Sequence, residues 1–219
     1  IRLSLVGSEM CIRDSLRGAQ VMEDRRNTQV MNRAALTKRV VGKLTKQEAV
    51  IGGIGNSNWD LWAAGHRAEN FYMLGSMGLA APIAMGVAIA QPERRVFALE
   101  GDGLLLMQLG CLSTIAAQAP KNLIVIIWDN GIYQITGGQG TPAAKAGTDL
   151  IAIARASGIA SAHWAADEAE FDALIDRALT TDGPHVIAAR IDNEPGKTQT
   201  DRDPIRFRET FMRGLAKPA

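Results

Sequence analysis

The sequence predicts one α/β domain, built on a doubly wound and mostly parallel sheet with helices on both faces. Strand-like and helix-like segments alternate along the chain, which is the pattern of parallel sheets with helical crossovers. The strand-like segments are continuous apolar runs, such as NLIVIIW at 122–128, and such runs are typical of strands buried on both faces. With 219 residues, the chain is long enough for one such domain and short for two.

The first half of the domain combines helices with one short strand. Residues 32–47 carry apolar side chains at helical spacing, and residues 48–52 form a short strand that ends in glycine. A short helix is expected over 58–65, with Asn58 as its N-cap. Residues 74–91 (LGSMGLAAPIAMGVAIAQ) are expected to form a glycine-rich turn and then a helix, near whose first turn a proline is tolerated.

The second half continues the alternation of strands and helices. We expect buried strands at 94–102 and 122–130, joined by one helix over 104–118 that is apolar nearly all round. Residues 131–147 contain five glycines and are expected to form a long functional loop, in which Gly137, Gly138 and Gln139 would belong to a closing lid. The remaining predicted elements are a helix at 148–158 capped by Thr148 and followed by Gly158, a helix at 166–181, a strand at 185–192 and a closing helix at 203–215.

Composition argues against several classes of protein. Lys and Arg number 24 and Asp and Glu 23, so the net charge is +1 and there is no polybasic segment for nucleic acid. The longest apolar stretch, 78–90, is too short to span a bilayer, and no signal-peptide layout is present. Cys11 and Cys111 are far apart and the three histidines lack ligand spacing, which argues against a disulfide framework and a transition-metal site. We expect a cytoplasmic protein.

The first residues differ from everything that follows. LSLVGSEMCIRDS at 3–15 fits no neighbouring element and resembles translated sequencing-adapter read-through. We therefore expect residues 1–26 to be non-native or disordered, and residues 27–219 to form the domain.

Two polar motifs follow neighbouring apolar strands at the point where each strand ends. Gly101, Asp102 and Gly103 end one strand, and Asn130 ends the next. Ligands of parallel sheets bind at the carboxyl ends of the strands. Asp102 and Asn130 offer the oxygen ligands that Mg²⁺ prefers, while the glycines allow a phosphate to approach the backbone closely. The pair predicts a Mg²⁺–diphosphate site; the alternative is a purely structural pair of turns.

Gly-Asp-Gly, 26 intervening residues and then Asn resembles the signature of thiamine-diphosphate-dependent enzymes. The stretches ENFYMLGSMG, APKNLIVIIWDNGIYQITGGQ, TDLIAIARASGI and DPIRFRETFMRGL are similar to the sulfopyruvate decarboxylase beta subunit and to phosphonopyruvate decarboxylase. The resemblance covers nearly all of residues 32–215. It implies the thiamine-diphosphate-binding fold and a lyase that decarboxylates a 2-oxo acid with an anionic side chain, most simply sulfopyruvate.

The resemblance also implies roles for individual residues. Asp102 and Asn130 would bind Mg²⁺ through their side chains and Ile132 through its carbonyl oxygen. Gly75 would accept a hydrogen bond from the aminopyrimidine, and Met77 would wedge the cofactor into its bent form. Leu104 stands where many relatives have Ser or Ala, so a hydroxyl contact would be missing. The expected cofactor-binding residues are Gly55, Asn56, Gly75, Ser76, Met77, Gly101, Asp102, Gly103, Leu104, Asn130, Ile132 and Tyr133.

The family also needs a glutamate from a pyrimidine-binding domain that this chain has no room for. Glu100 adjoins the motif on the wrong side of the cofactor and is better interpreted as a structural carboxylate. The resemblance therefore implies a pyrimidine-binding partner subunit or domain and an oligomeric enzyme. His66 and Arg67 would meet an anionic substrate or form a solvated helix end, and Tyr133 and Gln134 would line the pocket or pack.

Two alternative functions remain open at this point. A phosphonopyruvate decarboxylase, or a fragment like acetolactate synthase or benzoylformate decarboxylase, would use the same cofactor with another substrate. A non-catalytic nucleotide-binding module of doubly wound type would bind adenine nucleotides, but no G-x-G-x-x-G turn follows the first strand.

Overall fold

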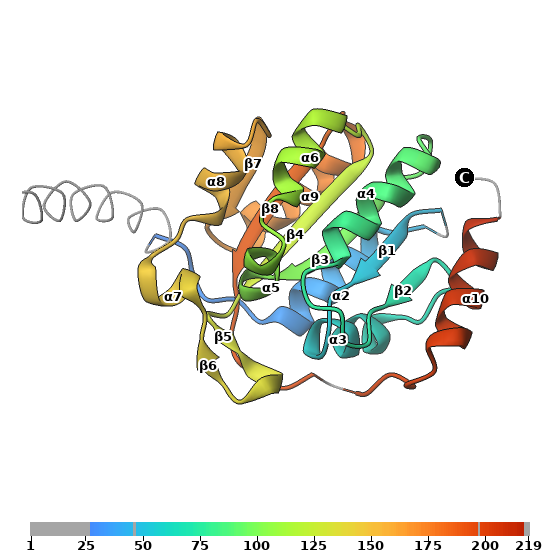
Figure 1. Ribbon diagram of the computed structural model, residues 1–219, viewed down its shortest axis with the longest axis horizontal. Helices are drawn as coiled ribbons and strands as arrows, with labels where there is room; N and C mark the ends of the chain where they lie inside the picture. The colour runs from blue at the N-terminus through green and yellow to red at the C-terminus, as the bar shows by residue number, and fades with distance from the viewer. Residues whose placement is uncertain (1–26, 46, 197, 217–219) are drawn as a thin grey trace, which may run out of the picture.

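The computed structural model describes residues 27–45, 47–196 and 198–216, and its centre is a six-stranded parallel sheet (Figure 1). The prediction for residues 1–26 lies outside the described residues. The strand order is β2-β1-β3-β4-β8-β7, and every pairing within it is parallel. The predicted doubly wound fold is therefore confirmed. The strands are β1 (Ala49–Gly52), β2 (Asn70–Tyr72), β3 (Val96–Gly101), β4 (Leu123–Asp129), β7 (Ser161–Ala165) and β8 (His185–Arg190).

Helices cover both faces of this sheet (Figure 1). One face carries α2 (Arg33–Lys43), α3 (Asn56–Ala64) and α9 (Glu168–Thr180), whose buried side chains form one apolar cluster with the strands. The other face carries the second cluster, with side chains from α4 (Ala80–Ala90), α5 (Asp102–Met107), α6 (Cys111–Gln118) and α8 (Leu150–Ala156).

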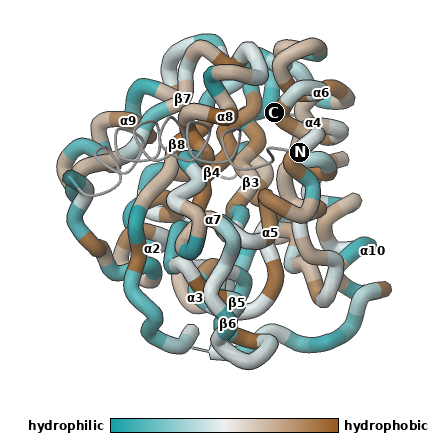
Figure 2. Tube along the Cα trace, turned by 60° about the vertical axis from the view of Figure 1, so that its left-hand side comes forward, coloured by the Kyte–Doolittle hydropathy of each residue, from teal (hydrophilic) through white to brown (hydrophobic). Residues whose placement is uncertain are grey.

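The central strands form the core because their side chains are buried on both faces. All seven residues of β4 are buried, as the continuous apolar run predicts. Figure 2 shows apolar colouring gathered around β3, β4 and β8. Among the described residues, no helix is long and apolar enough to cross a membrane.

The C-terminal helix α10 (Pro204–Leu215) packs against β2, the outermost strand on its side (Figure 1). Phe207 lies 5.3 Å from Tyr72 between ring centroids and joins one apolar cluster. Phe211 lies 5.4 Å from Phe71 and joins the other cluster. One helix thus closes the ends of both cores.

Several predicted boundaries are wrong, each for a local reason. The helix expected over 104–118 is two helices, because Gln108, with φ −130° and ψ 38°, ends α5. Helix α3 begins at Asn56, so Asn58 lies inside it and donates to the Met73 carbonyl oxygen instead of capping. The cap of α8 is Asp149, which accepts from two helix amides, and not Thr148. Sequence analysis did not identify β2 and β7.

The segment predicted as one long loop has its own structure. It contains a small antiparallel hairpin, β5 (Ile132–Tyr133) with β6 (Gln139–Gly140), a 3₁₀ turn over Gln134–Thr136, and the short helix α7 (Pro142–Ala146). This segment lies beside the carboxyl ends of the central strands, where it forms one side of the pocket described next (Figure 1).

Candidate active site

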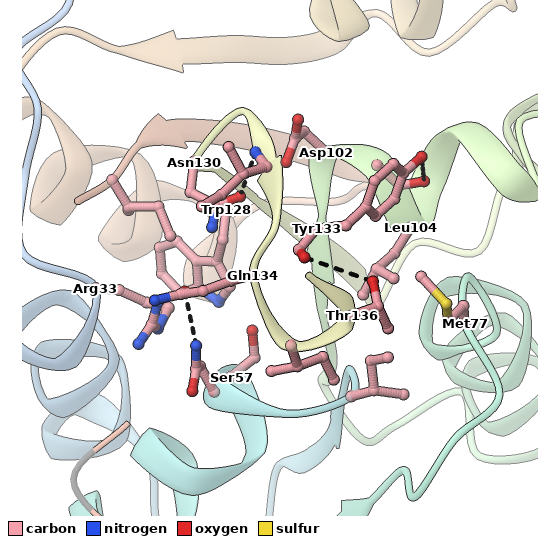
Figure 3. A pocket seen from close by; sticks show the side chains of 17 residues that line it. Arg33, Ser57, Met77, Asp102, Leu104, Trp128, Asn130, Tyr133, Gln134 and Thr136 are labelled. Carbon is pink, nitrogen blue, oxygen red and sulfur yellow. Dashed lines mark hydrogen bonds between the residues drawn. The ribbon is translucent and has the colours of Figure 1, made fainter. Parts of the chain in front are cut away.

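An open pocket lies at the carboxyl ends of four parallel strands (Figure 3). Its walls come from the segments that follow β1, β3, β4 and β8, together with the turn before α4. Strand order reverses between β1 and β3, and ligands of open α/β sheets bind at such switch points. The lining residues are Arg33, Ile54, Asn56, Ser57, Met77, Gly101, Asp102, Gly103, Leu104, Trp128, Asn130, Ile132, Tyr133, Gln134, Ile135, Thr136 and Ile191.

Asp102 is the carboxylate of this pocket, and a buried threonine holds it. Asp102 is the first residue of α5 and is 1% exposed. The hydroxyl of Thr141, a fully buried residue, donates to Asp102 Oδ2 at 2.5 Å and also caps α7 by accepting from Ala144 N at 3.2 Å. The Thr141 amide donates to the Gly131 carbonyl oxygen at 2.9 Å. Thr141 thereby joins the strand ends of β3 and β4.

Asn130 lies on the turn that follows β4. Its side-chain oxygen accepts from the Ile132 amide at 3.2 Å, which is the Asx-type bond that fixes such turns. Because β3 and β4 are neighbours in register, with Gly101 opposite Trp128, the Asp102 and Asn130 segments leave the sheet side by side. Asp102, Asn130 and Ile132 all line the pocket, as the spacing of the two motifs predicts.

Gly103 allows the hairpin to pack directly on the start of α5. A Cβ atom at this position would lie 2.4 Å from Tyr133 Cε1 and 2.8 Å from Thr141 Cγ2, which are distances that real Cβ atoms do not reach. The Tyr133 hydroxyl lies 3.4 Å from the Gly103 carbonyl oxygen. Tyr133 therefore both lines the pocket and packs, so the two interpretations of this residue hold together.

An apolar wall stands on another side of the pocket. Leu104 is buried in a small cluster with Ile54 and Met73, and Met77 packs against that cluster. Met77 comes from the turn before α4, and Figure 3 shows its side chain near Leu104. The wall carries no hydroxyl at Leu104, as expected from the sequence.

Glu100 is a structural carboxylate, as the sequence indicates. It is fully buried and caps α4, because its Oε1 atom accepts from the Ala81 amide at 3.1 Å. Burial disfavours the charged form and raises the pKa of Glu100 to about 7. The Glu100 cap fixes the helix whose preceding turn carries Met77 into the pocket.

Three of the expected cofactor-binding residues do not line this pocket. Gly75 and Ser76 are exposed on the turn before α4, and Gly55 lies against a separate, adjoining hollow. Asn56 does line the pocket, but its amide is bonded on both sides: it donates to Gln134 Oε1 at 2.7 Å and accepts from Gly196 N at 3.1 Å.

His66 and Arg67 also lie outside the pocket lining. His66 stacks on Trp62 with ring centroids 4.2 Å apart, and its Nδ1 atom lies 3.1 Å from the Tyr72 hydroxyl. Arg67 donates to the Thr45 carbonyl oxygen at 2.8 Å. His66 is exposed and Arg67 is partly buried just after α3, which favours the solvated helix end over contact with an anionic substrate.

Sequence reasoning missed several lining residues, of which Arg33 and Trp128 are the largest. Arg33 lies at the start of α2, far along the chain from either motif. Trp128 lies within the apolar run of β4, where it reads as core. Gln134 was identified only as an alternative. A polar residue inside an otherwise apolar helical stripe, as at Arg33, is the one signal that was present.

Comparison with known proteins gives the family. Residues 53–189 match the family model described as thiamine pyrophosphate enzyme, C-terminal TPP binding domain. The chain is 38% identical to the sulfopyruvate decarboxylase subunit beta of Methanothermobacter thermautotrophicus, over 84% of this chain and 95% of that protein. It is equally 38% identical to the phosphonopyruvate decarboxylase of Streptomyces hygroscopicus, over 81% of this chain and 45% of that protein.

A solved structure shows the same fold. The benzoylformate decarboxylase of Polynucleobacter necessarius matches with a TM-score of 0.60 at 19% identity, over 74% of this chain and 33% of that chain. The chain spans less than half the length of the phosphonopyruvate decarboxylases that it matches. The family match runs from the residue after β1 to Ala189 in β8 and includes the ends of β3 and β4 that line the pocket, so this chain belongs to the family of thiamine pyrophosphate enzyme C-terminal, TPP-binding domains.

Proposed function

We propose that this chain binds thiamine diphosphate with Mg²⁺ and forms the cofactor-binding half of a decarboxylase of a 2-oxo acid with an anionic side chain, most simply sulfopyruvate. The observation that carries the proposal is the meeting of Asp102 and Asn130 in one pocket at the ends of neighbouring strands. Family membership supports the cofactor. The substrate rests on the two kinds of decarboxylase that the chain resembles about equally.

The residues present fit a magnesium ion with a diphosphate. Asp102 offers a carboxylate oxygen, Asn130 an amide oxygen and Ile132 a backbone carbonyl, and Mg²⁺ takes its remaining ligands from phosphate and water. In the described part of the chain no group of three or more His, Cys, Asp or Glu side chains could hold a metal.

Each wall of the pocket then has a task. Gly103 and Leu104 would offer backbone amides to the diphosphate, and Thr141 would keep the Asp102 carboxylate oriented through its 2.5 Å hydrogen bond. Met77 and Leu104 would exclude water from the apolar side and pack against the cofactor rings. Thiamine diphosphate, when bound, supplies the electron sink for decarboxylation, while the protein supplies position and electrostatics.

The chemistry requires a partner. Asp102 is the one carboxylate among the described lining residues, and its proposed task is metal binding, so the pocket holds no second acid to engage the aminopyrimidine. We propose that a pyrimidine-binding subunit or domain supplies that glutamate. The relative from Methanothermobacter thermautotrophicus, named as a subunit beta, supports a separate partner chain.

Thermal unfolding tests the cofactor assignment. Thiamine diphosphate with Mg²⁺ at 100 times its dissociation constant should stabilise the chain by about 2.7 kcal/mol, which raises Tm by roughly 5–10 °C. Asp102→Ala should abolish the shift. Asp182→Ala is the matched control, because Asp182 is an exposed carboxylate just before β8, at the other end of the sheet. A shift that survives Asp102→Ala, or no shift with the partner present, refutes the assignment.

Product analysis tests the substrate. With the partner present, sulfopyruvate should yield sulfoacetaldehyde and CO₂ faster than phosphonopyruvate or pyruvate yield their products. A preference for phosphonopyruvate would instead support a phosphonopyruvate decarboxylase. This is the second candidate, because the chain is equally identical in sequence to relatives of both kinds. Stabilisation by adenine nucleotides instead of thiamine diphosphate would indicate a nucleotide-binding module.

A further inference from the structure

A buried arginine lines the candidate active site. Arg33, at the first position of α2, is 2% exposed, and it is the only basic side chain among the described residues that line the pocket. Asp102 is the only acidic one. An arginine taken out of water costs free energy unless its N–H groups are bonded and its charge is matched, so its partners show what it can still bind.

Two bonds hold the Arg33 guanidinium in place. Nε donates to Asp60 Oδ2 of α3 at 2.7 Å, and Nη2 donates to the Glu194 carbonyl oxygen, in the segment after β8, at 2.8 Å. A guanidinium carries five N–H groups in a planar fork. Nη1 makes no hydrogen bond within the part of the chain that the structure describes, and Arg33 lines the pocket.

A second donor lies in the same pocket wall. The indole Nε1 of Trp128 is buried and has no hydrogen-bond partner among the described residues. Figure 3 shows Trp128 and Arg33 together on one side of the pocket, across from Met77. A buried donor without an acceptor is unusual in a folded protein, because it costs free energy until an acceptor arrives. This wall therefore suits an oxygen-rich anion.

The charge of the proposed ligand points the same way. A diphosphate carries more negative charge than one Mg²⁺ neutralises, and Asp102 adds another negative charge to the same pocket. The positive charge of Arg33 is largely balanced by its ion pair with Asp60. Arg33 therefore contributes mainly directed N–H donors to the pocket. A planar fork with free donors matches phosphate oxygens well.

We propose that Arg33 contacts the diphosphate of the cofactor and makes this pocket select a diphosphate over a monophosphate, with Asp60 as the residue that positions it. The inference rests on the proposed function and adds a binding residue to it. Arg33 lies across the pocket from Met77, which would face the cofactor rings, so Arg33 would face the diphosphate. The residue is therefore a part of cofactor recognition and not only a buried link between α2 and α3.

Calorimetric titration of the full chain tests this, with Mg²⁺–pyrophosphate and Mg²⁺–orthophosphate as probes. Arg33→Gln should raise Kd for pyrophosphate about 10- to 100-fold, the equivalent of one charge-assisted hydrogen bond, and change Kd for orthophosphate less than about threefold. Asp60→Asn breaks the same ion pair but leaves the guanidinium. It should lower Tm as Arg33→Gln does, yet keep or tighten pyrophosphate binding.

The two variants separate a binding role from a structural one. If Arg33 only joins two helices, both variants lower Tm and leave the preference for pyrophosphate over orthophosphate unchanged, which overturns the inference. If Arg33→Gln does not fold, Arg33→Lys replaces it. This variant keeps the positive charge but not the planar fork of N–H groups. The preference for pyrophosphate over orthophosphate should fall by at least about threefold, and an unchanged preference would refute the binding role of Arg33. If the unaltered chain binds neither probe, the inference is refuted, while the proposed function is judged separately by the thermal shift with thiamine diphosphate and the partner.

Discussion

Replacing Thr141 by valine should weaken the fold and the pocket together, because one hydroxyl serves two partners. It donates to Asp102 Oδ2 at 2.5 Å and accepts from the Ala144 amide at 3.2 Å. Valine keeps the shape of the side chain and removes both bonds. A hydrogen bond to a charged group contributes about 1.5–3 kcal/mol, and a helix cap about 1 kcal/mol.

The expected loss for Thr141→Val is therefore about 2–4 kcal/mol in the free energy of unfolding. A chain of this size loses about 2–4 °C of Tm per kcal/mol, so Tm should fall by roughly 5–15 °C. Thr141→Ser is the matched control, since it keeps the hydroxyl and removes one methyl group, at a cost of about 1 kcal/mol.

Urea unfolding, followed by circular dichroism at pH 7, measures both variants. A double-mutant cycle with Asp102→Ala isolates the bond between the two side chains, and a coupling of about 1–2 kcal/mol is expected. A Thr141→Val variant that unfolds within about 0.5 kcal/mol of the unaltered chain, or a cycle without coupling, would show that Thr141 does not hold Asp102.

Three further changes test other parts of the structure. Gly103→Ala places a Cβ 2.4 Å from Tyr133 Cε1, so the hairpin must move. We expect this variant to lose the rise in Tm that Mg²⁺ and thiamine diphosphate cause. A retained rise would contradict the close packing at Gly103. Glu100 has its pKa raised to about 7, above its unfolded value, so the folded state binds the extra proton and loses stability as pH rises from about 4.5 to about 7. Between pH 5 and pH 8, the free energy of unfolding of the unaltered chain, measured in urea, should therefore fall by about 2–3 kcal/mol relative to that of Glu100→Gln. Parallel pH profiles of the two proteins would refute the raised pKa of Glu100. In Gly214→Ala, the new Cβ would lie 2.6 Å from the Ala68 backbone, so α10 should detach and proteolysis should cut it sooner; an unchanged cleavage rate would count against this packing.

The fold and the two polar motifs of the site can be predicted from the sequence because both depend on short-range patterns. Continuous apolar runs give β3 and β4, and the polar residues that follow them must emerge at one edge of the sheet. Asp102 and Asn130 could be placed together on that reasoning alone, and the structure does place them in one pocket.

The remaining features depend on contacts between distant segments. Thr141 caps α7, but nothing local shows that its hydroxyl also reaches Asp102, 39 residues away. Asn58 has the right residue type for a cap, yet α3 begins two residues earlier and the side chain bonds to Met73 instead. The break after α5 is hidden because apolar residues continue on both sides of Gln108.

The position of α10 bears on how the chain behaves in solution. Phe207 and Phe211, one turn apart, insert into the two cores on either side of β2, so the helix covers the outermost strand. An uncovered edge strand offers its backbone to other chains and promotes aggregation. Removal of residues 204–216 would therefore lower solubility as well as stability. The last helix thus acts as a safeguard against association through β2.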